Sequence, residues 1–338
     1  MPQPPFIQLV NVTKIFGKNI VLEGLNLEIN YGEILGIIGK SGSGKTTLLN
    51  LVIGFLKADK GEVIFQSRKI EKDVSNVNMQ FGFSSQESSF YDKLSVEENL
   101  QYFGSLYKID DNTLKKRITE LLNFVGLEDY GKYLAINLSA GMKKRLDIAC
   151  SLVHDPKILI LDEPTSDLDP YLRRDILKLL KKINKEKSVT IAITSHLLDE
   201  LDICDKIAIL DNKKIITKGS SNELKDKYTR NMEIILETSS RNYGWLEKSF
   251  KNNRDASKTL VKDGKFILYT DNAESVLKEV LGMIKDKNEK LLDIDVNKPS
   301  LNEVFEYFID KDKEEALLEK RNKGKKNVQN TGDNKEES

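Results

Sequence analysis

The chain has 338 residues, enough for two domains at about 100–200 residues per domain. Its 53 basic and 53 acidic residues give a formal net charge of zero, which argues against the basic excess of a nucleic-acid-binding protein. No apolar run approaches the roughly 20 residues that span a bilayer, and the first residues lack the pattern of a signal peptide. We therefore expect a soluble, cytosolic protein in which Cys150 and Cys204 are buried thiols.

The first strand-like pieces span residues 7–10, 21–22 and 25–29. Phe16 lies between them, directly before a glycine. An aromatic residue in this setting usually packs in a core or turn, but it can also stack on a purine base. The residues alone leave both interpretations open.

The central motif is the phosphate-binding loop pattern of residues 39–46, Gly-Lys-Ser-Gly-Ser-Gly-Lys-Thr. An apolar strand-like run precedes it and a helix-like segment follows it, which is the context that the motif requires. Glycines let successive backbone N–H groups converge on an anion, and the helix adds its positive end. The residues predicted to contact phosphate are Gly39, Lys40, Ser41, Gly42, Ser43, Gly44, Lys45, Thr46 and Thr47. Lys45 should reach the β- and γ-phosphates, and the Thr46 hydroxyl should hold Mg²⁺.

Residues 57–86 indicate a small antiparallel excursion with strands at 60–65 and 81–86. The second of these strands ends on Gln86. A glutamine at a strand end is usually a surface residue, although its carbonyl oxygen can also orient a water molecule or bind Mg²⁺.

A mostly helical region follows. Ser95 and Glu98 form a capping box, and a helix over residues 114–124 should end at Gly126.

Ser139 begins a further helix and has a glycine close behind it, at Gly141. This segment is either a second anion site or an ordinary serine-capped helix start. In the helix itself, Lys143, Lys144 and Arg145 should lie largely off the apolar face.

Residues 158–161 are four consecutive apolar residues, typical of a strand buried on both faces of a parallel sheet. Asp162 and Glu163 follow at once, and buried carboxylates need a partner. A metal ion at the phosphates would supply it, with Asp162 holding Mg²⁺ and Glu163 polarising the attacking water. The alternative is a turn with two acidic residues.

A turn at residues 166–170, which includes Asp169, leads into a helix over 172–183. The next buried-type strand spans residues 189–195 and ends on His196, where it could donate to a phosphate. The other histidine, His154, is interpreted as a surface or helix-capping residue. Residues 197–222 predict a helix and a hairpin with strands at 206–210 and 214–217.

From residue 228 the chain becomes more polar and predicts a small α+β domain up to residue 310, before a charged, disordered tail over 311–338. Residues 1–227 form the predicted nucleotide-binding domain. Strands are expected at 232–237, 265–269 and 291–296, and helices at 245–250, 273–284 and 301–309, the last with a capping box of Ser300 and Glu303.

With all segments in view, residues 6 to about 225 resemble the ATP-binding subunits of ABC transporters. The matches in chain order are Phe16 for the aromatic that stacks on adenine, residues 39–46 for the Walker A loop, Gln86 for the Q-loop, residues 138–142 for the signature motif, residues 158–162 for the Walker B strand, Glu163 for the adjoining carboxylate, residues 166–169 for the D-loop and His196 for the switch histidine.

The chain departs from the usual Leu-Ser-Gly-Gly-Gln signature at Ala140 and Met142, while Ser139 and Gly141 are kept. The change removes the hydrogen bonds that the glutamine side chain would make. Residues 296–305 are similar to the end of drug-exporter ATPases that pair with separate membrane subunits.

The resemblance implies a P-loop NTPase core of ABC type, an α/β fold with an antiparallel β subdomain and a helical subdomain. It implies ATP and Mg²⁺ as cofactors. The implied catalytic residues are Glu163, His196 and Gln86, the implied metal ligands are Thr46, Gln86 and Asp162, and the implied ATP contacts outside the loop are Phe16, Ser139, Gly141 and Asp169.

The implied function is ATP hydrolysis in a head-to-tail dimer that powers export of a drug-like or lipid-like substrate. A separate transmembrane permease would hold the chain at the inner face of the cell membrane, with residues 87–107 as the expected contact. No nucleic-acid partner is expected.

Two other classes remain open from the residues. A non-transport ABC ATPase that acts on ribosomes or DNA usually carries two ATPase units or a long coiled coil, and this sequence has neither. A P-loop kinase or GTPase switch would leave residues 139–142 without a purpose, and the guanine-reading Asn-Lys-x-Asp pattern does not occur. A polytopic membrane protein encoded beside this gene would favour transport.

Overall fold

The computed structural model describes residues 4–72, 74–227, 232–251, 253–297, 304–305 and 309. The chain divides into two compact units, Met1–Ser220 and Ser221–Ser338. The predicted domain limits at residues 227 and 310 stay a prediction. The predicted tail, the Ser300–Glu303 capping box and most of the predicted helix at 301–309 lie outside the described residues.

A six-stranded sheet forms the centre of the first unit, with strand order β10-β9-β3-β8-β7-β6. All neighbouring strands are parallel except β10, which pairs antiparallel with β9. The strands are β3 (Ile34–Ile38), β6 (Phe81–Ser84), β7 (Ile158–Leu161), β8 (Thr190–Ser195), β9 (Lys206–Asp211) and β10 (Lys214–Gly219). Every residue of β3, β7 and β8 is buried, because helices and a second sheet cover both faces.

The second sheet of this unit is antiparallel, with strand order β2-β1-β4-β5. Its strands are β1 (Ile7–Phe16), β2 (Asn19–Ile29), β4 (Lys60–Phe65) and β5 (Arg68–Lys69). β1 and β2 are longer than the short pieces predicted, because the chain continues the pairing through register shifts, with Asn11 at a φ of 51°.

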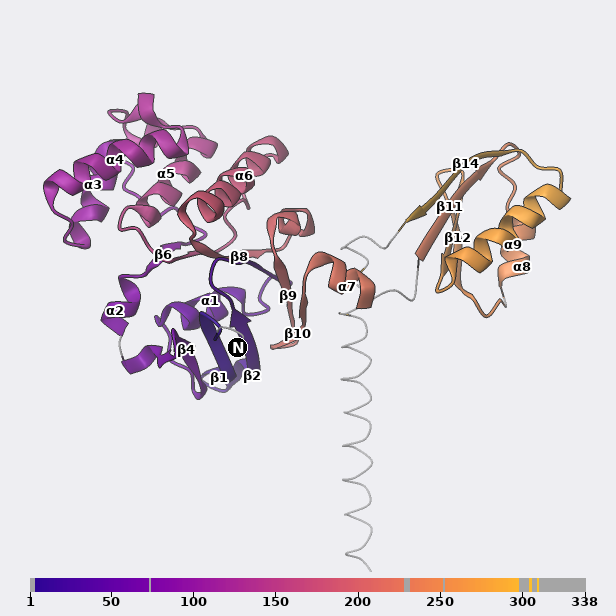
Figure 1. The fold of residues 1–338 in the computed structure, drawn as a ribbon, viewed down its shortest axis with the longest axis horizontal. Helices are drawn as coiled ribbons and strands as arrows, with labels where there is room; N and C mark the ends of the chain where they lie inside the picture. Colours follow the sequence, from indigo (N-terminus) through magenta and orange to yellow (C-terminus); the bar gives the residue numbers. More distant parts are fainter. Residues whose placement is uncertain are drawn as a thin grey trace, which may run out of the picture. The chain divides into compact units, whose positions relative to one another are not determined.

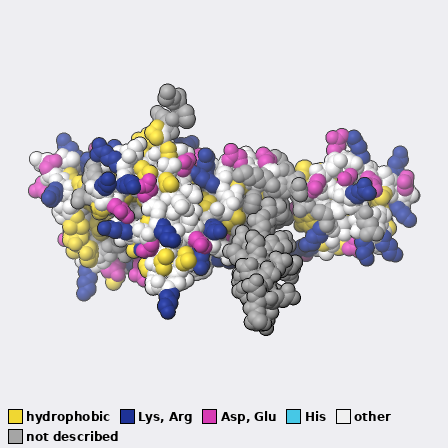
Figure 2. Space-filling model, turned by 90° about the horizontal axis from the view of Figure 1, so that it is seen from below, with side chains coloured by type: hydrophobic (Ala, Val, Ile, Leu, Met, Phe, Trp, Pro, Cys, Tyr) yellow, Lys and Arg dark blue, Asp and Glu magenta, His cyan; other side chains and the backbone are white. Residues whose placement is uncertain are grey.

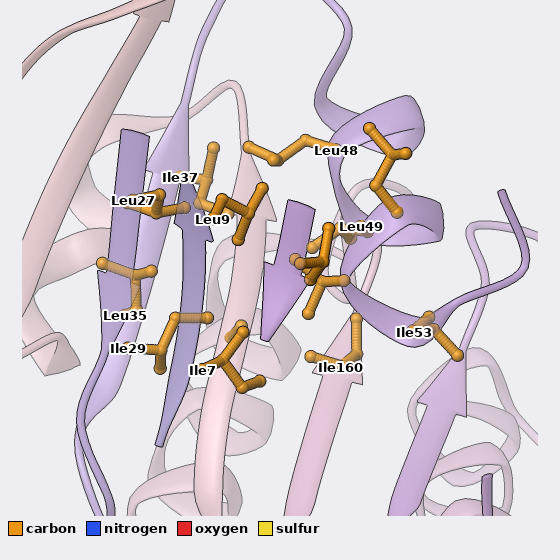
Figure 3. Packing of buried hydrophobic residues seen from close by; sticks show 14 of the residues in the cluster. Ile7, Leu9, Leu27, Ile29, Leu35, Ile37, Leu48, Leu49, Ile53 and Ile160 are labelled. Carbon is orange, nitrogen blue, oxygen red and sulfur yellow. The ribbon is translucent and has the colours of Figure 1, made fainter. Parts of the chain in front are cut away.

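Helix α1 (Lys45–Ile53) lies between the two sheets and joins them into one core. Three of its apolar residues, Leu48, Leu49 and Ile53, are labelled in Figure 3 and lie among apolar side chains of both sheets. The helix therefore begins at a fixed point above the carboxyl end of β3, which is where the phosphate-binding loop must place it.

The helical subdomain consists of α3 (Val96–Leu106), α4 (Asp111–Val125) and α5 (Ala140–Leu152), which pack on one another (Figure 1). The capping box is confirmed, since Ser95 Oγ accepts from Glu98 N at 3.2 Å and Glu98 Oε2 accepts from Ser95 N at 2.7 Å. Gly126 ends α4 at a φ of 72°, as predicted.

Helix α6 (Pro170–Lys187) packs against β8. The predicted helix after His196 is a 3₁₀ helix, η4 (Leu198–Ile203). The remaining short elements of the first unit are η1 (Ile70–Lys72), α2 (Val74–Asn78), η2 (Glu128–Tyr130) and η3 (Ala135–Asn137).

The second unit begins with α7 (Ser221–Lys227) and contains an antiparallel sheet of order β12-β13-β11-β14 with two further helices. Its elements are β11 (Met232–Thr238), α8 (Gly244–Phe250), β12 (Ala256–Lys262), β13 (Lys265–Thr270), α9 (Ala273–Asp286) and β14 (Leu291–Asn297). Residues from both helices and from β11 and β13 form its core. Strand β12 was not predicted, because this edge strand carries lysines where an alternating apolar pattern would be needed.

The predicted antiparallel excursion over residues 57–86 is wrong at its second strand. β4 does lie in the antiparallel sheet, but β6 pairs parallel with β7 at the edge of the six-stranded sheet. A short run such as Phe81–Ser84 does not contain the information that selects its partner strand. The correction matters because it brings Gln86 to the same edge as the phosphate-binding loop.

The described surface mixes charges of both signs, and Figure 2 shows lysines and arginines interspersed with acidic side chains on the face in view. None of the helices in the described part of the chain combines the length and apolar character needed to cross a bilayer. Cys150 and Cys204 are buried free thiols, as predicted, and burial raises the pKa of both.

His154, interpreted from the sequence as a surface or helix-capping residue, is partly buried just after the end of α5. Its ring stacks on Tyr107 with centroids 3.7 Å apart, and its Nε2 donates to the Phe81 carbonyl oxygen at 3.0 Å. Burial lowers the pKa of His154 from 6.5 to about 4. The buried Nδ1 has no hydrogen-bond partner among the described residues, so a second proton there would find no acceptor.

We expect His154 to make folding sensitive to acid. Between pH 6.5 and about 4, His154 is protonated in the unfolded chain but neutral in the folded chain, because folding lowers its pKa. The free energy of unfolding should therefore fall as the pH drops through this window, by about 3 kcal/mol at most. Urea unfolding above and within the window should show a smaller pH-dependent fall for His154→Phe than for the native chain. Equal falls in the two proteins would contradict the assignment.

Candidate functional site

The sequence-predicted residues follow four adjacent parallel strands of the central sheet. The phosphate-binding loop follows β3, His196 follows β8, Asp162 and Glu163 follow β7, and Gln86 comes two residues after β6. Since these strands are neighbours in the order β3-β8-β7-β6, their carboxyl ends bring the residues to one edge.

The loop takes the backbone shape that an anion cradle needs. Gly42 and Gly44 have φ values of 76° and 104°, which favour glycine, and α1 begins directly after Gly44. A Cβ at Gly39 would lie 2.5 Å from the Leu210 carbonyl oxygen, so a side chain there would force the loop off strand β9. The loop thus points the first N–H groups of α1 at one place.

Lys45 is 6% exposed, and its ammonium group is held by the loop itself. Nζ donates to the carbonyl oxygens of Gly39 at 2.9 Å and Lys40 at 3.3 Å. It also lies 3.2 Å from Glu163 Oε1. The cation is therefore held in the loop with its third contact turned toward the acidic residues.

Two cavities lie against the loop. One has a volume of about 270 Å³ and is lined by Val21, Ser41, Gly42, Gly44, Lys45, Thr46, Thr47, Gln86 and Glu163. The other has a volume of about 390 Å³ and is lined by Asn19, Ile20, Val21, Lys40, Ser41, Gly42, Ser43, Asp211, Asn212 and Lys213. Together they combine the backbone of the glycine-rich loop, the buried Lys45 cation and two carboxylates, Glu163 and Asp211.

Asp162 and Glu163 are organised by Thr194, a residue that the sequence analysis did not single out. Thr194 Oγ1 donates to Asp162 Oδ1 at 2.6 Å and accepts from Glu163 N at 2.9 Å. Glu163 has a φ of 47°, an uncommon backbone conformation for this residue. One hydroxyl therefore fixes both the buried aspartate and the turn that points Glu163 into the cavity. Its place two residues before His196 was the only available sign.

His196 lies beside Glu163, with Nδ1 3.1 Å from Glu163 Oε2. The Glu163 carboxylate thus contacts Lys45 through one oxygen and His196 through the other. His196 is exposed, so it can also contact a ligand that enters the cavity.

The donors near the cavity fit a magnesium ion. Thr46 and Gln86 line the cavity and offer a hydroxyl and an amide oxygen, and Asp162 offers a buried carboxylate at the same edge of the sheet. Oxygen donors with one or two carboxylates are what Mg²⁺ takes when nucleotide phosphates complete its shell.

Seven predicted site residues do not line either cavity: Phe16, Gly39, Ser139, Gly141, Asp162, Asp169 and His196. Phe16 is 47% exposed and pairs with Asn19, which lines the larger cavity. Asp169 caps α6, accepting from Tyr171 N and Leu172 N.

Ser139 caps α5 and is exposed. A Cβ at Gly141 would lie 2.8 Å from Leu172 Cδ2, so a side chain there would displace the end of the Leu172 side chain.

Lys144 is buried, although it lies off the face of Met142, Leu146 and Ala149 as predicted. It is 9% exposed and is paired with Asp147, which is 1% exposed, at 3.3 Å between Nζ and Oδ2. Sequence reasoning missed Asp147, because a charged residue in an apolar helix face is recognisable only once its partner is known.

Residues 22–166 match the ABC transporter family. The chain is 30% identical over 302 residues to the linearmycin resistance ATP-binding protein LnrL of Bacillus subtilis, covering 88% of this chain and 96% of the relative. It is 36% identical over 230 residues to the methionine import ATP-binding protein MetN of Clostridium tetani, covering 66% of this chain and 71% of the relative.

Among solved structures, the chain is similar to the ATP-binding cassette MJ0796, seen as a dimer in a post-hydrolysis state with ADP and Pi. The TM-score is 0.57 and the identity 29%, over 63% of this chain and 98% of the cassette. The predicted fold class, an α/β core of this type with antiparallel and helical subdomains, is confirmed by this likeness and by the sheets described above.

Thr194→Val should lower nucleotide hydrolysis by about tenfold, because Asp162 and the Glu163 turn lose the hydroxyl that orients them. The matched control is Thr190→Val at the opposite end of β8, where Thr190 Oγ1 accepts from Gly32 N at 2.9 Å. Each variant should lose about 1–3 kcal/mol of unfolding free energy. Turnover measured under saturating nucleotide should fall only for Thr194→Val. A comparable loss in both variants would point to general destabilisation.

Proposed function

The chain belongs to the family of ATP-binding subunits of ABC transporters, and from that premise we propose how its residues bind and hydrolyse ATP and what it powers. Members of this family are ATPases that dimerise and work with transmembrane partners. The observation that carries the proposal is the set of chemical groups at one sheet edge: the loop, Lys45, Thr46, Gln86 and Glu163.

In the proposed site, the loop amides and Lys45 hold the phosphates of ATP. Lys45 Nζ lies 3.2 Å from Glu163 Oε1, and it can exchange this contact for a phosphate oxygen, since both acceptors are anionic. Thr46, Gln86 and Asp162 hold Mg²⁺, which neutralises phosphate charge when bound. Glu163, released from Lys45, accepts a proton from the attacking water, and His196 keeps the carboxylate oriented through Nδ1. The exposed ring of Phe16 stacks on adenine.

A second copy completes the site in this proposal. Ser139 and Ala140 are exposed at the N-terminus of α5 and do not line the cavities of their own chain. A helix N-terminus favours an anion, so α5 of one copy can close over the γ-phosphate held by the other. The dimeric state of the related cassette supports this arrangement, with Gly141 and Asp169 at the same contact.

Export is the direction that the comparisons favour. The match to the linearmycin resistance protein covers 88% of this chain, whereas the match to the methionine import protein covers 66%. The longer match includes residues of the second unit. We therefore propose that the chain powers export of a drug-like or lipid-like substrate through a separate permease. A role on ribosomes or DNA has no comparable support.

The surface proposed for the permease follows Gln86. Tyr91 is 49% exposed, and its ring packs edge-on against Tyr102 with centroids 4.9 Å apart. Leu106, at the end of α3, is 58% exposed. Large apolar side chains grouped on a surface are typical of a protein interface. Docking here would place the chain at the inner face of the cell membrane and next to Gln86.

Glu163→Gln should bind ATP and form a stable dimer while hydrolysing ATP about 10²–10⁴-fold more slowly, because the amide cannot accept the proton. Glu186→Gln, an exposed position on α6, is the matched control and should behave as the native chain. Size-exclusion chromatography with ATP and Mg²⁺ and a phosphate-release assay measure the two effects. Normal turnover of Glu163→Gln would remove Glu163 from the proposed role.

Tyr102→Ser should weaken co-purification with a polytopic membrane protein encoded beside this gene, because a buried aromatic contact is lost at the interface. ATP turnover of the isolated chain should stay unchanged. Tyr31→Ser, which alters a 59% exposed tyrosine in the loop before β3, is the control. If both variants co-purify equally well, the permease docks elsewhere.

A further inference from the structure

A buried polar cluster lies where α5 packs against the end of β6 (Figure 1). Asp147, Lys144 and Ser84 are 1%, 9% and 0% exposed. Lys144 Nζ lies 3.3 Å from Asp147 Oδ2 and donates to Ser84 Oγ at 3.2 Å, while Ser84 Oγ donates to Asp147 Oδ2. None of the three residues lines either cavity.

The Asp147 carboxylate holds both sides of the loop that carries Gln86. Oδ2 accepts from the Ser84 hydroxyl, two residues before Gln86. Oδ1 accepts from Ser89 N at 3.1 Å, three residues after it. One side chain on a neighbouring helix therefore closes the loop at its base.

The same loop is tied to the acidic pair. The Ser84 carbonyl oxygen accepts from Asp162 N at 2.9 Å, so the base of the loop and the buried aspartate share a backbone hydrogen bond. A change in the contacts between α5 and Ser84 would therefore alter the relative positions of Gln86 and Asp162.

A buried charge pair is stable only when its remaining hydrogen-bonding capacity is satisfied. Here the Ser84 hydroxyl and the Ser89 N–H satisfy Asp147, and Lys144 balances its charge. Since loss of one partner would leave an unpaired charge, the cluster forms as a unit. Such a unit can hold a loop in one position. A loop that is surrounded by solvent has no comparable restraint.

We propose that Asp147, balanced by Lys144, is a positioning residue that fixes Gln86 in the orientation needed for Mg²⁺ and water. The inference rests on the proposed role of Gln86. It adds residues outside the site, Asp147 and Lys144, that control the orientation of Gln86. Without the cluster the loop is still present, but Gln86 samples other orientations. Turnover is then lower and more Mg²⁺ is needed for half-maximal activity, while ATP binding is unchanged.

The first test is Lys144→Met/Asp147→Leu, which removes both charges and leaves no unpaired one. At saturating ATP its turnover should fall about tenfold, with the KM for ATP changed less than about twofold and the Mg²⁺ concentration for half-maximal activity raised. Asp175→Leu/Lys178→Met is the matched control: its pair has the same three-residue spacing on α6, and Lys178 is 80% exposed. The control should leave all three quantities unchanged.

The second test asks whether the cluster acts through Gln86. Gln86→Ala alone should lower turnover, and adding Lys144→Met/Asp147→Leu to it should cost little more, because the positioned group is already gone. Losses that multiply would overturn the inference. A Gln86→Ala variant with normal turnover and Mg²⁺ dependence would instead refute the proposed role of Gln86, and the inference with it.

Ser84→Ala is the variant to use if the double variant does not fold, because it removes one arm of the cluster and keeps the ion pair. It should show a smaller fall in turnover, with the same unchanged KM for ATP. A variant that unfolds more easily yet keeps native turnover and Mg²⁺ dependence per folded molecule would show a purely structural cluster, and would overturn the inference.

Discussion

The site depends on a buried lysine whose donors are all used. Lys45 has three N–H groups and three acceptors: two loop carbonyls and the Glu163 carboxylate. Only the carboxylate can be replaced by a ligand without breaking the loop. The core of the first unit positions this cation, because α1 begins at Lys45 and the apolar residues of α1 pack between two sheets. A shift of α1 would move the lysine and the helix N-terminus together.

The parallel sheet converts chain order into spatial order. Four strands with their carboxyl ends at one edge bring together groups that are up to about 160 residues apart in sequence, from the loop to His196. The edge strand β6 extends this row to Gln86, and α5 then links the row to the helical subdomain through Asp147. In the proposed dimer, one chain would therefore carry two half-sites on a common framework, one at the loop and one at the start of α5.

Much of the fold and of the candidate site could be predicted because it depends on short sequence patterns. A glycine-rich loop between a strand and a helix, acidic residues after an apolar run and capping pairs each depend on a few consecutive residues, and the fold class followed from them. The roles of the individual site residues stay predictions. What failed depended on distant partners: β6 was placed in the wrong sheet, and the sequence did not reveal the burial of Lys144 beside Asp147 or the stacking of His154 on Tyr107. Thr194 and Asp147 went unnoticed because ordinary threonines and aspartates gain meaning only from the groups that packing sets beside them.

Glu163 combines a carboxylate side chain with a left-handed backbone conformation, and that conformation costs about 1–3 kcal/mol. Glycine or asparagine would occupy that conformation more comfortably, yet neither has the carboxylate that the proposed role as a base requires. The fold therefore gives up some thermal robustness at this one turn, and the hydrogen bond from its amide to Thr194 keeps the turn from relaxing. Selection for heat resistance alone would therefore be expected to replace Glu163 early. The resulting proteins would be more stable but, under the proposed role of Glu163, would not hydrolyse ATP.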